Sequence, residues 1–191
     1  MNPSKMPELW LIRHRETEWT VSRRHTGLTD VPLTVSGENQ ARRLRTLLKN
    51  THFATVFCSP LQRARRTCEL SGYGDIATIA EDLVEWNYGD YEGQRRPDIL
   101  AARPDWMVFR DGCPNGESPD DIAGRADRII TCVRSISGDV AIFSSGHFLR
   151  VLIARWLGYS AYTGRHFKLG TGAIAAVGYD HQNELEPAVA S

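Results

Sequence analysis

The sequence lacks the features that define several large classes of protein. Its 23 basic and 23 acidic side chains leave no formal net charge at pH 7, so no overall field attracts nucleic acid or an anionic membrane. No apolar stretch approaches the roughly 18 residues of a membrane-spanning helix, and the N-terminal MNPSKMPELW has no signal-peptide core. We therefore expect a cytoplasmic protein with no nucleic-acid or membrane partner, in which any anion site is local.

Cysteine is scarce, and repeats and low-complexity segments are missing. The four cysteines are widely spaced without a C-x-x-C pair, which argues against a zinc site and against a disulfide framework. We expect free thiols at Cys58, Cys68, Cys113 and Cys132. A chain of 191 residues without repeats fits a single domain spanning residues 1–191.

The segments that are present alternate between short apolar runs and amphipathic stretches. Strands are expected within residues 8–12, 53–59, 76–86, 139–145 and 172–180. Helices are expected within residues 36–50, where Ser36 is a suitable N-cap, and within 61–70, 116–136 and 147–158. This alternation predicts an α/β fold, a three-layer α/β/α sandwich with a mostly parallel central sheet. Residues 87–119 are rich in Gly, Pro and Asp and predict an irregular cap with a short helix near 96–102.

Three of the predicted strands end in similar polar residues. Arg13 and His14 close the first strand, Arg63 lies in the first turn after the second, and His147 follows a later strand and opens a helix. Because the carboxyl ends of parallel strands share one edge of a sheet, we expect these side chains to meet. Guanidinium groups match phosphate oxygens, and backbone N–H groups at the helix start near His147 would add donors. The pattern predicts a phosphate site.

The same side chains suggest a reaction. A neutral imidazole facing phosphorus can attack it and form a phosphohistidine that water later cleaves. Such a reaction needs an acid to protonate the leaving alkoxide and then a base to activate water. Glu85, which follows an apolar run and begins the irregular region, is the candidate for both steps.

Six motifs, in order, resemble the histidine phosphatase superfamily, in its phosphoglycerate-mutase-like branch. They are LIRHRETEW, TGLTDVPLTVSGENQA, VFCSPLQRARRT, EWNYGDYEG, DGCPNGES and SSGHFLR, and the resemblance covers about residues 9–180. It implies that His14 is the nucleophile, that Glu85 is the proton donor, and that Arg13, Arg63 and His147 bind phosphate, with His147 also catalytic. It further implies phosphate contact by Thr20 and substrate contacts by Thr26, Gly27, Tyr88 and Arg110. The family's chemistry uses no metal, and we expect no cofactor.

Arg15 departs from the pattern, because the family usually has glycine there. If the backbone at this position is ordinary, Arg15 points outward or adds a cation to the pocket. If the backbone is left-handed, a side chain costs roughly 1–2 kcal/mol and the phosphate site is distorted. Ser145 also stands where many relatives have histidine, to which we attach little weight.

The resemblance and the short cap predict a metal-independent phosphomonoesterase. A short cap leaves water access, which favours hydrolysis over phosphoryl return to product. Small phosphate esters are the expected partners, and sugar phosphates are the leading candidates. A phosphoglycerate-mutase-type phosphotransferase and a weakly active or inactive phosphate-ligand binder, because of Arg15, stay open as alternatives, as does a homodimer. We expect the histidines outside the pocket to be surface residues: His25, His52, His166 and His181.

Overall fold

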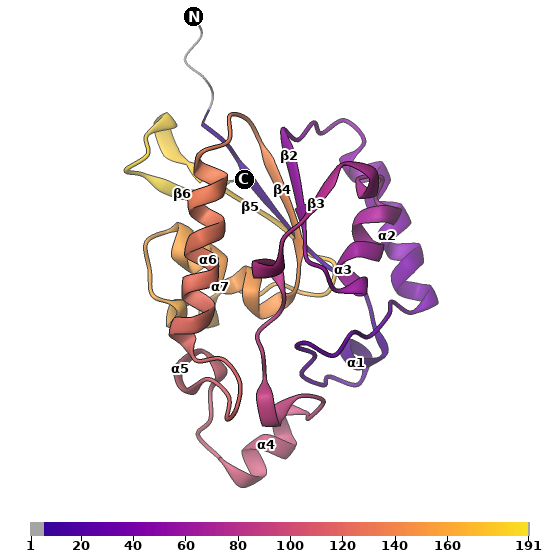
Figure 1. The fold of residues 1–191 in the computed structure, drawn as a ribbon, viewed down its shortest axis with the longest axis vertical. Helices are drawn as coiled ribbons and strands as arrows, with labels where there is room; N and C mark the ends of the chain where they lie inside the picture. Colours follow the sequence, from indigo (N-terminus) through magenta and orange to yellow (C-terminus); the bar gives the residue numbers. More distant parts are fainter. Residues whose placement is uncertain (1–5, 191) are drawn as a thin grey trace, which may run out of the picture.

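The computed structural model describes residues 6–190, which form a six-stranded sheet between layers of helices (Figure 1). The strands are β1 (Leu9–Arg13), β2 (Thr55–Cys58), β3 (Ala77–Ile79), β4 (Val140–Ser144), β5 (Ile174–Tyr179) and β6 (Pro187–Ala190). Their order is β3-β2-β4-β1-β5-β6. The first four are parallel, whereas β5 is antiparallel to β1 and β6 to β5. The prediction of a mostly parallel sheet is confirmed.

Helices cover both faces of the sheet. They are α1 (Glu18–Val21), α2 (Val35–Leu48), α3 (Gln62–Leu70), α4 (Arg96–Ala102), α5 (Val108–Asp111), α6 (Pro119–Arg134) and α7 (Gly146–Trp156). Short 3-10 segments are η1 (Gly74–Ile76), η2 (Glu81–Leu83), η3 (Gly89–Tyr91), η4 (Ala161–His166) and η5 (Asp180–Gln182). Alternation along β4 divides the core, because Val140 and Ile142 join the cluster containing α6 and α7. Ala141 and Phe143 join the cluster containing α2 and α3, which completes the three-layer sandwich.

Two boundaries show how local chemistry sets the elements. The Thr34 hydroxyl accepts a hydrogen bond from Gly37 N at 2.9 Å, so α2 is capped by Thr34 and not by Ser36 as expected. Helix α6 begins at a reciprocal capping box between Ser118 and Asp121. Strand β6 was not expected from the sequence, because its four residues show no clear alternation of apolar and polar side chains. It is defined by its antiparallel pairing with β5.

The cap places its short helices at the carboxyl ends of the parallel strands, below the sheet in Figure 1. Helix α4 confirms the short helix expected near residues 96–102, and the cap also contains η3 and α5. All four cysteines are free thiols, as expected. Among the described residues, no helix combines the length and the apolar character that crossing a membrane requires.

Candidate active site

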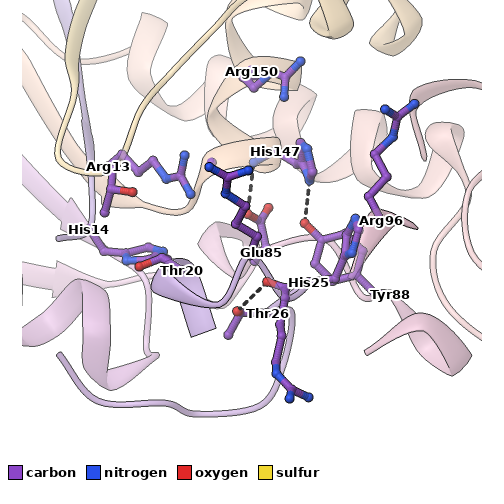
Figure 2. Close-up of a pocket in the computed structure, with 14 residues that line it drawn as sticks. Arg13, His14, Thr20, His25, Thr26, Glu85, Tyr88, Arg96, His147 and Arg150 are labelled. Carbon is purple, nitrogen blue, oxygen red and sulfur yellow. Dashed lines mark hydrogen bonds between the residues drawn. The ribbon is translucent and has the colours of Figure 1, made fainter. Parts of the chain in front are cut away.

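A cavity of about 330 Å³ opens where the strand ends meet the cap (Figure 2). The end of β1, the start of α7, the loop after α1 and the cap all contribute to it. Its lining residues are Arg13, His14, Thr20, Arg23, Arg24, His25, Thr26, Glu85, Tyr88, Arg96, Gly146, His147, Arg150 and Thr171. The strand ends therefore converge, and among the described residues Glu85 is the only carboxylate that lines the cavity.

His14 is held with one ring nitrogen free. The residue is only 3% exposed, and its Nδ1 lies 2.8 Å from the carbonyl oxygen of Arg15. A carbonyl can only accept, so Nδ1 carries the proton. Burial first, and then the nearby cations of Arg63 and Arg13, hold the pKa of His14 well below its usual value of 6.5. The ring is therefore neutral near pH 7, and Nε2 has a free lone pair.

His147 has the opposite tautomer. Its Nδ1 lies 2.5 Å from the Tyr88 hydroxyl. Burial raises the pKa of the Tyr88 phenol well above 10, so the hydroxyl keeps its proton. The hydroxyl has no other hydrogen-bond partner among the described residues, so Nδ1 is the acceptor available for that proton. Burial, followed by the charge of Arg150, lowers the pKa of His147 well below 6.5. A neutral ring that accepts at Nδ1 carries its proton on Nε2, which makes His147 Nε2 a donor.

Glu85 occupies the start of α7 (Figure 2). Its Oε1 accepts hydrogen bonds from Trp86 N at 2.9 Å and Phe148 N at 2.8 Å, and its Oε2 accepts from His147 N at 3.0 Å. The expectation that the helix-start N–H groups near His147 face a phosphate is therefore wrong for residues 147 and 148. Those donors instead orient the buried carboxyl group of Glu85 at the start of α7.

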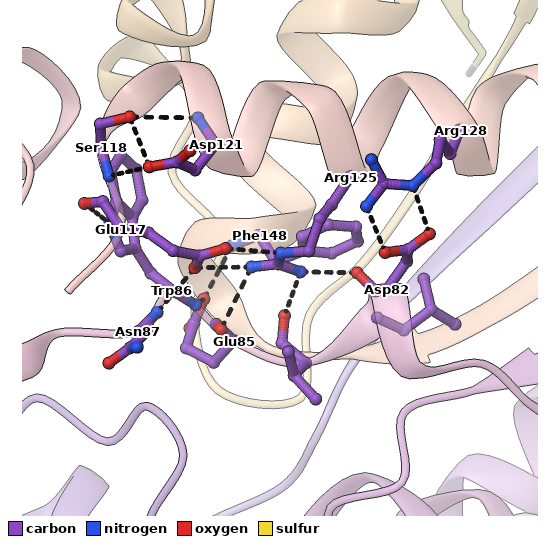
Figure 3. Close-up of polar contacts among 12 residues, drawn as sticks. Asp82, Glu85, Trp86, Asn87, Glu117, Ser118, Asp121, Arg125, Arg128 and Phe148 are labelled. Carbon is purple, nitrogen blue, oxygen red and sulfur yellow. Dashed lines mark hydrogen bonds and ion pairs between the residues drawn. The ribbon is translucent and has the colours of Figure 1, made fainter.

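Arg125 holds the segment that carries Glu85, and no motif in the sequence marks it for this role (Figure 3). This buried arginine of α6 donates to the carbonyl oxygens of Asp82, Val84 and Glu85 at 2.6, 3.0 and 3.3 Å. It also pairs with Glu117 at 2.7 Å. The segment that carries Glu85 is thus tied to a helix rather than left as a free loop.

The two predicted phosphate arginines are placed differently. Arg13 lines the cavity and donates from Nη1 to Leu169 O at 2.6 Å. Arg63 is fully buried and does not line the cavity. Its Nη groups donate to Thr26 O, Gly27 O and Thr29 O at 3.1, 2.7 and 2.9 Å, so it shapes the loop that follows α1. The Nε atoms of both arginines are buried without a hydrogen-bond partner.

Other predicted residues divide between the cavity and its surroundings. Thr20, Thr26 and Tyr88 line the cavity, whereas Gly27 lies behind it, with its N–H bonded to Glu92 at 2.8 Å. Arg110 is exposed, and its guanidinium pairs with Asp111 at 2.8 Å. It lines a separate surface depression. The structure does not bring Arg110 to the cavity.

The structure adds residues to the cavity that the sequence pattern missed. His25, expected on the surface, is half-buried and lines the cavity, with its Nδ1 at 3.0 Å from Gln94 O. Further additions are Arg23, Arg24, Arg96, Arg150 and Thr171. Most come from loops and helix ends, where no periodicity marks the side that a residue faces.

Of the alternatives for Arg15, the structure shows an ordinary backbone with the side chain outside the cavity. Among described residues other than glycine, positive φ occurs at Arg23, Asn115 and His181, so the Arg15 backbone is not left-handed. The Arg15 side chain does not line the cavity and packs over Gly172, where an added Cβ would collide with it. The Ser145 hydroxyl is buried without a partner.

Possible metal ligands lie elsewhere in the described chain. Asp180, His181 and Glu186, all exposed around the turn between β5 and β6, offer ligand atoms within 4.8 Å of one another. The cavity itself combines neutral imidazoles and guanidiniums with Glu85, a donor set that suits an oxyanion better than a cation.

Fold and cavity together define a class of α/β protein with a two-histidine, arginine-rich anion site at the strand ends. The sequence matches the family model of the histidine phosphatase superfamily (branch 1) over residues 9–186, so the chain belongs to this superfamily. It is 38% identical to an acid phosphatase of Mycobacterium tuberculosis over 91% of this chain and 87% of that protein. It is 31% identical to a sedoheptulose 1,7-bisphosphatase of Saccharomyces cerevisiae, over 98% and 93%. A solved structure of an open reading frame from M. tuberculosis superposes with a TM-score of 0.91 at 36% identity, covering 97% of this chain and 96% of that chain.

Proposed function

We propose that the chain hydrolyses small phosphate monoesters, sugar phosphates among them, through a phosphohistidine at His14. The family and its phosphatase relatives support hydrolysis of small esters. The observation that carries the proposal is a pair of histidines in one cavity whose hydrogen-bond partners assign them opposite tautomers. His14 Nε2 offers a lone pair, and His147 Nε2 offers a proton.

In the first half of the reaction, the lone pair of His14 Nε2 forms a bond to phosphorus while the ester P–O bond breaks. The Arg13 guanidinium and His147 Nε2–H hold the phosphoryl oxygens, and Glu85 as the acid gives its proton to the leaving alkoxide. Arg63 acts on this step by keeping the His14 ring neutral and by fixing the loop that carries Thr26.

In the second half, water attacks phosphorus and the N–P bond breaks, which returns the lone pair to Nε2. Glu85, now a carboxylate, takes the proton from that water. The Nδ1–H bond to Arg15 O persists through both steps, so His14 keeps the orientation it needs for another cycle.

The remaining expectations extend the same proposal. The partner is a small phosphate ester rather than a nucleic acid or a membrane, the location is the cytoplasm, and a homodimer is compatible with the chemistry. We expect Thr20 to contact phosphate and Thr26 and Tyr88 to contact substrate, since all three line the cavity. The substrate role expected for Arg110 has no support from its position.

Release of inorganic phosphate from a panel of sugar monophosphates and bisphosphates, with EDTA present, tests the function. We expect turnover in EDTA and an acid-labile phosphoenzyme that is missing in His14→Ala. Loss of activity on chelation would contradict the mechanism. Isomerisation faster than phosphate release on addition of bisphosphoglycerate would favour a mutase, and affinity without release would favour a ligand-binding role.

A further inference from the structure

A second cavity of about 500 Å³ adjoins the first. The two share four lining residues, His25, Arg96, His147 and Arg150. Beyond these, the second cavity is walled by the cap and by η4. We call it the distal cavity. Because His147 lies at the boundary, an ester with its phosphate at His14 has room for its alcohol part in the distal cavity.

The lining of the distal cavity is rich in cations. Among the described residues it includes Arg96, Arg150 and Arg165 and no acidic residue, while Glu85 in the first cavity is the carboxylate whose charge acts on Arg150. Arg150 donates to Gly164 O and Arg165 O at 3.1 and 3.0 Å, and Arg165 donates to Tyr162 O at 3.3 Å. These contacts are all to backbone oxygens.

Arg96 differs from the arginines around it. Its guanidinium makes no hydrogen bond or ion pair with the described residues, although it lines both cavities. The preceding residue, Arg95, pairs with Asp98 at 2.9 Å and lines neither cavity. Arg95, whose charge is paired, thus lines neither cavity, whereas Arg96, whose charge is unpaired among the described residues, lines both.

The apolar wall strengthens any charge pairing inside the distal cavity. Trp106 and Phe109, both almost fully buried, form part of the lining, and the Arg150 guanidinium lies 4.5 Å from the centre of the Phe109 ring. A low-dielectric wall raises the strength of electrostatic contacts, and a stacked guanidinium with two carbonyl bonds is already oriented.

From this geometry we propose that the distal cavity binds a second phosphate of the substrate, through Arg96 and Arg150 with Arg165 nearby, so that bisphosphate esters are preferred over monophosphates. The inference rests on the proposed function, because it takes the first phosphate to lie at His14. Three cations without a carboxylate suit a dianionic phosphate better than a singly charged carboxylate, since each guanidinium can donate to separate phosphate oxygens.

Matched substrates test the proposal in wild type, Arg96→Gln and the control Arg95→Gln. We compare kcat/KM for fructose 1,6-bisphosphate with that for fructose 6-phosphate, and 3-phosphoglycerate with glycerol 3-phosphate. For wild type, we expect the bisphosphate to be favoured by roughly tenfold to a hundredfold, the range of one or two charge-assisted contacts. Arg96→Gln should lower this ratio about tenfold or more, and Arg95→Gln should leave it unchanged.

An unchanged ratio in Arg96→Gln, or a wild type that favours the monophosphate, would overturn the proposal. A preference confined to the glycerate pair would assign the cations to a carboxylate and overturn it as well. Calorimetric titration of the two fructose esters into His14→Ala separates the two proposals. If wild type hydrolyses no ester, the proposed function fails. The distal site is still supported if His14→Ala binds fructose 1,6-bisphosphate more tightly than fructose 6-phosphate and if adding Arg96→Gln abolishes this difference.

Discussion

The two sides of the active-site cavity are built in different ways. The floor, which we define as His14, Glu85 and His147, is placed by strand ends and by the start of α7, and each side chain has a fixed hydrogen-bond partner. The rim, which we define as Arg23 and Arg96, is exposed, and neither guanidinium has a partner among the described residues. The floor fixes proton positions for chemistry, and the rim leaves charge available for recognition.

Backbone geometry repeats this contrast. At the floor, His14 N donates to Ser144 O at 2.9 Å, which continues the parallel pairing of β1 with β4 beyond its last strand residue. At the rim, Arg23 has a φ of 57°, a left-handed conformation that is uncommon for a residue with a side chain. Such outliers gather at binding sites, where the surrounding structure holds them. Changes at the floor should therefore reduce turnover, and changes at the rim should alter selectivity.

The largest effect is expected for His14→Ala. Without the nucleophile no phosphohistidine forms, so kcat for any phosphate ester should fall by about four orders of magnitude or more. Steady-state phosphate release measures this, with the exposed His52→Ala as the matched control. Residual turnover above about 1% of wild type would show that the floor does not supply the nucleophile.

Glu85→Gln should be the next most severe change. The amide oxygen can still accept from Trp86 N and Phe148 N, but the amide nitrogen cannot accept from His147 N. The amide also cannot deliver or take the reaction's proton, so kcat should fall roughly 10²–10⁴-fold. Esters with a good leaving group, such as p-nitrophenyl phosphate, should lose less in the first step, because they need no acid. Glu81→Gln, an exposed carboxylate nearby, is the control. Equal losses for good and poor leaving groups would argue against a role as acid.

Tyr88→Phe tests the tautomer of His147. Removal of the hydroxyl leaves the part-buried Nδ1 without its donor, at a cost of about 1 kcal/mol, and releases the ring to take either tautomer. We expect kcat to fall about tenfold and the ring ¹⁵N shifts of His147 to change. Tyr91→Phe, which removes a hydroxyl with no hydrogen bond among the described residues, should change neither. Unaltered ¹⁵N shifts in Tyr88→Phe would refute the assignment.

The pH profile should reflect the lowered pKa values of the floor histidines. Burial chiefly keeps His14 and His147 neutral, so the acid limb of kcat/KM should lie below pH 6.5. In the unfolded chain the same rings take up protons near pH 6.5, so the free energy of unfolding should fall as pH drops below that value. Arg63→Gln removes a cation near His14 and should move the acid limb upward, unlike the exposed Arg65→Gln. An acid limb at or above pH 6.5 in wild type would contradict the burial argument.

The same contrast explains how much the sequence could predict. Strand periodicity predicted that His14 and His147 meet, because residues that follow parallel strands share one sheet edge. Glu85 was instead predicted as the acid from its place after an apolar run and from the family resemblance. The sequence could not predict that Glu85 takes the helix-start donors, since that depends on Arg125 fixing residues 82–85. It also missed His25 and Arg96, because a residue in an irregular loop or at a helix start gives no sign of the side it faces. Arg63 was predicted to bind phosphate, but it does not line the cavity, and its contacts with the loop carbonyls depend on tertiary packing that the sequence does not reveal.

The smallest effect is expected for Arg15→Gly, although this position departs most visibly from the family pattern. The backbone at residue 15 is not left-handed, and its carbonyl bond to His14 does not depend on the side chain. We expect kcat/KM within about threefold of wild type and a loss of about 1 kcal/mol in stability, since glycine gains freedom in the unfolded chain. Arg15→Ala removes the packing over Gly172 without adding the backbone freedom of glycine, so comparing the two variants by chemical denaturation separates the two contributions. Phosphate release by each variant measures the effect on kcat/KM. A gain of several hundredfold in kcat/KM for Arg15→Gly would mean that the arginine displaces His14. The orientation of His14 would then not be fixed by its hydrogen bond to the residue 15 carbonyl, and the distinction between floor and rim would fail.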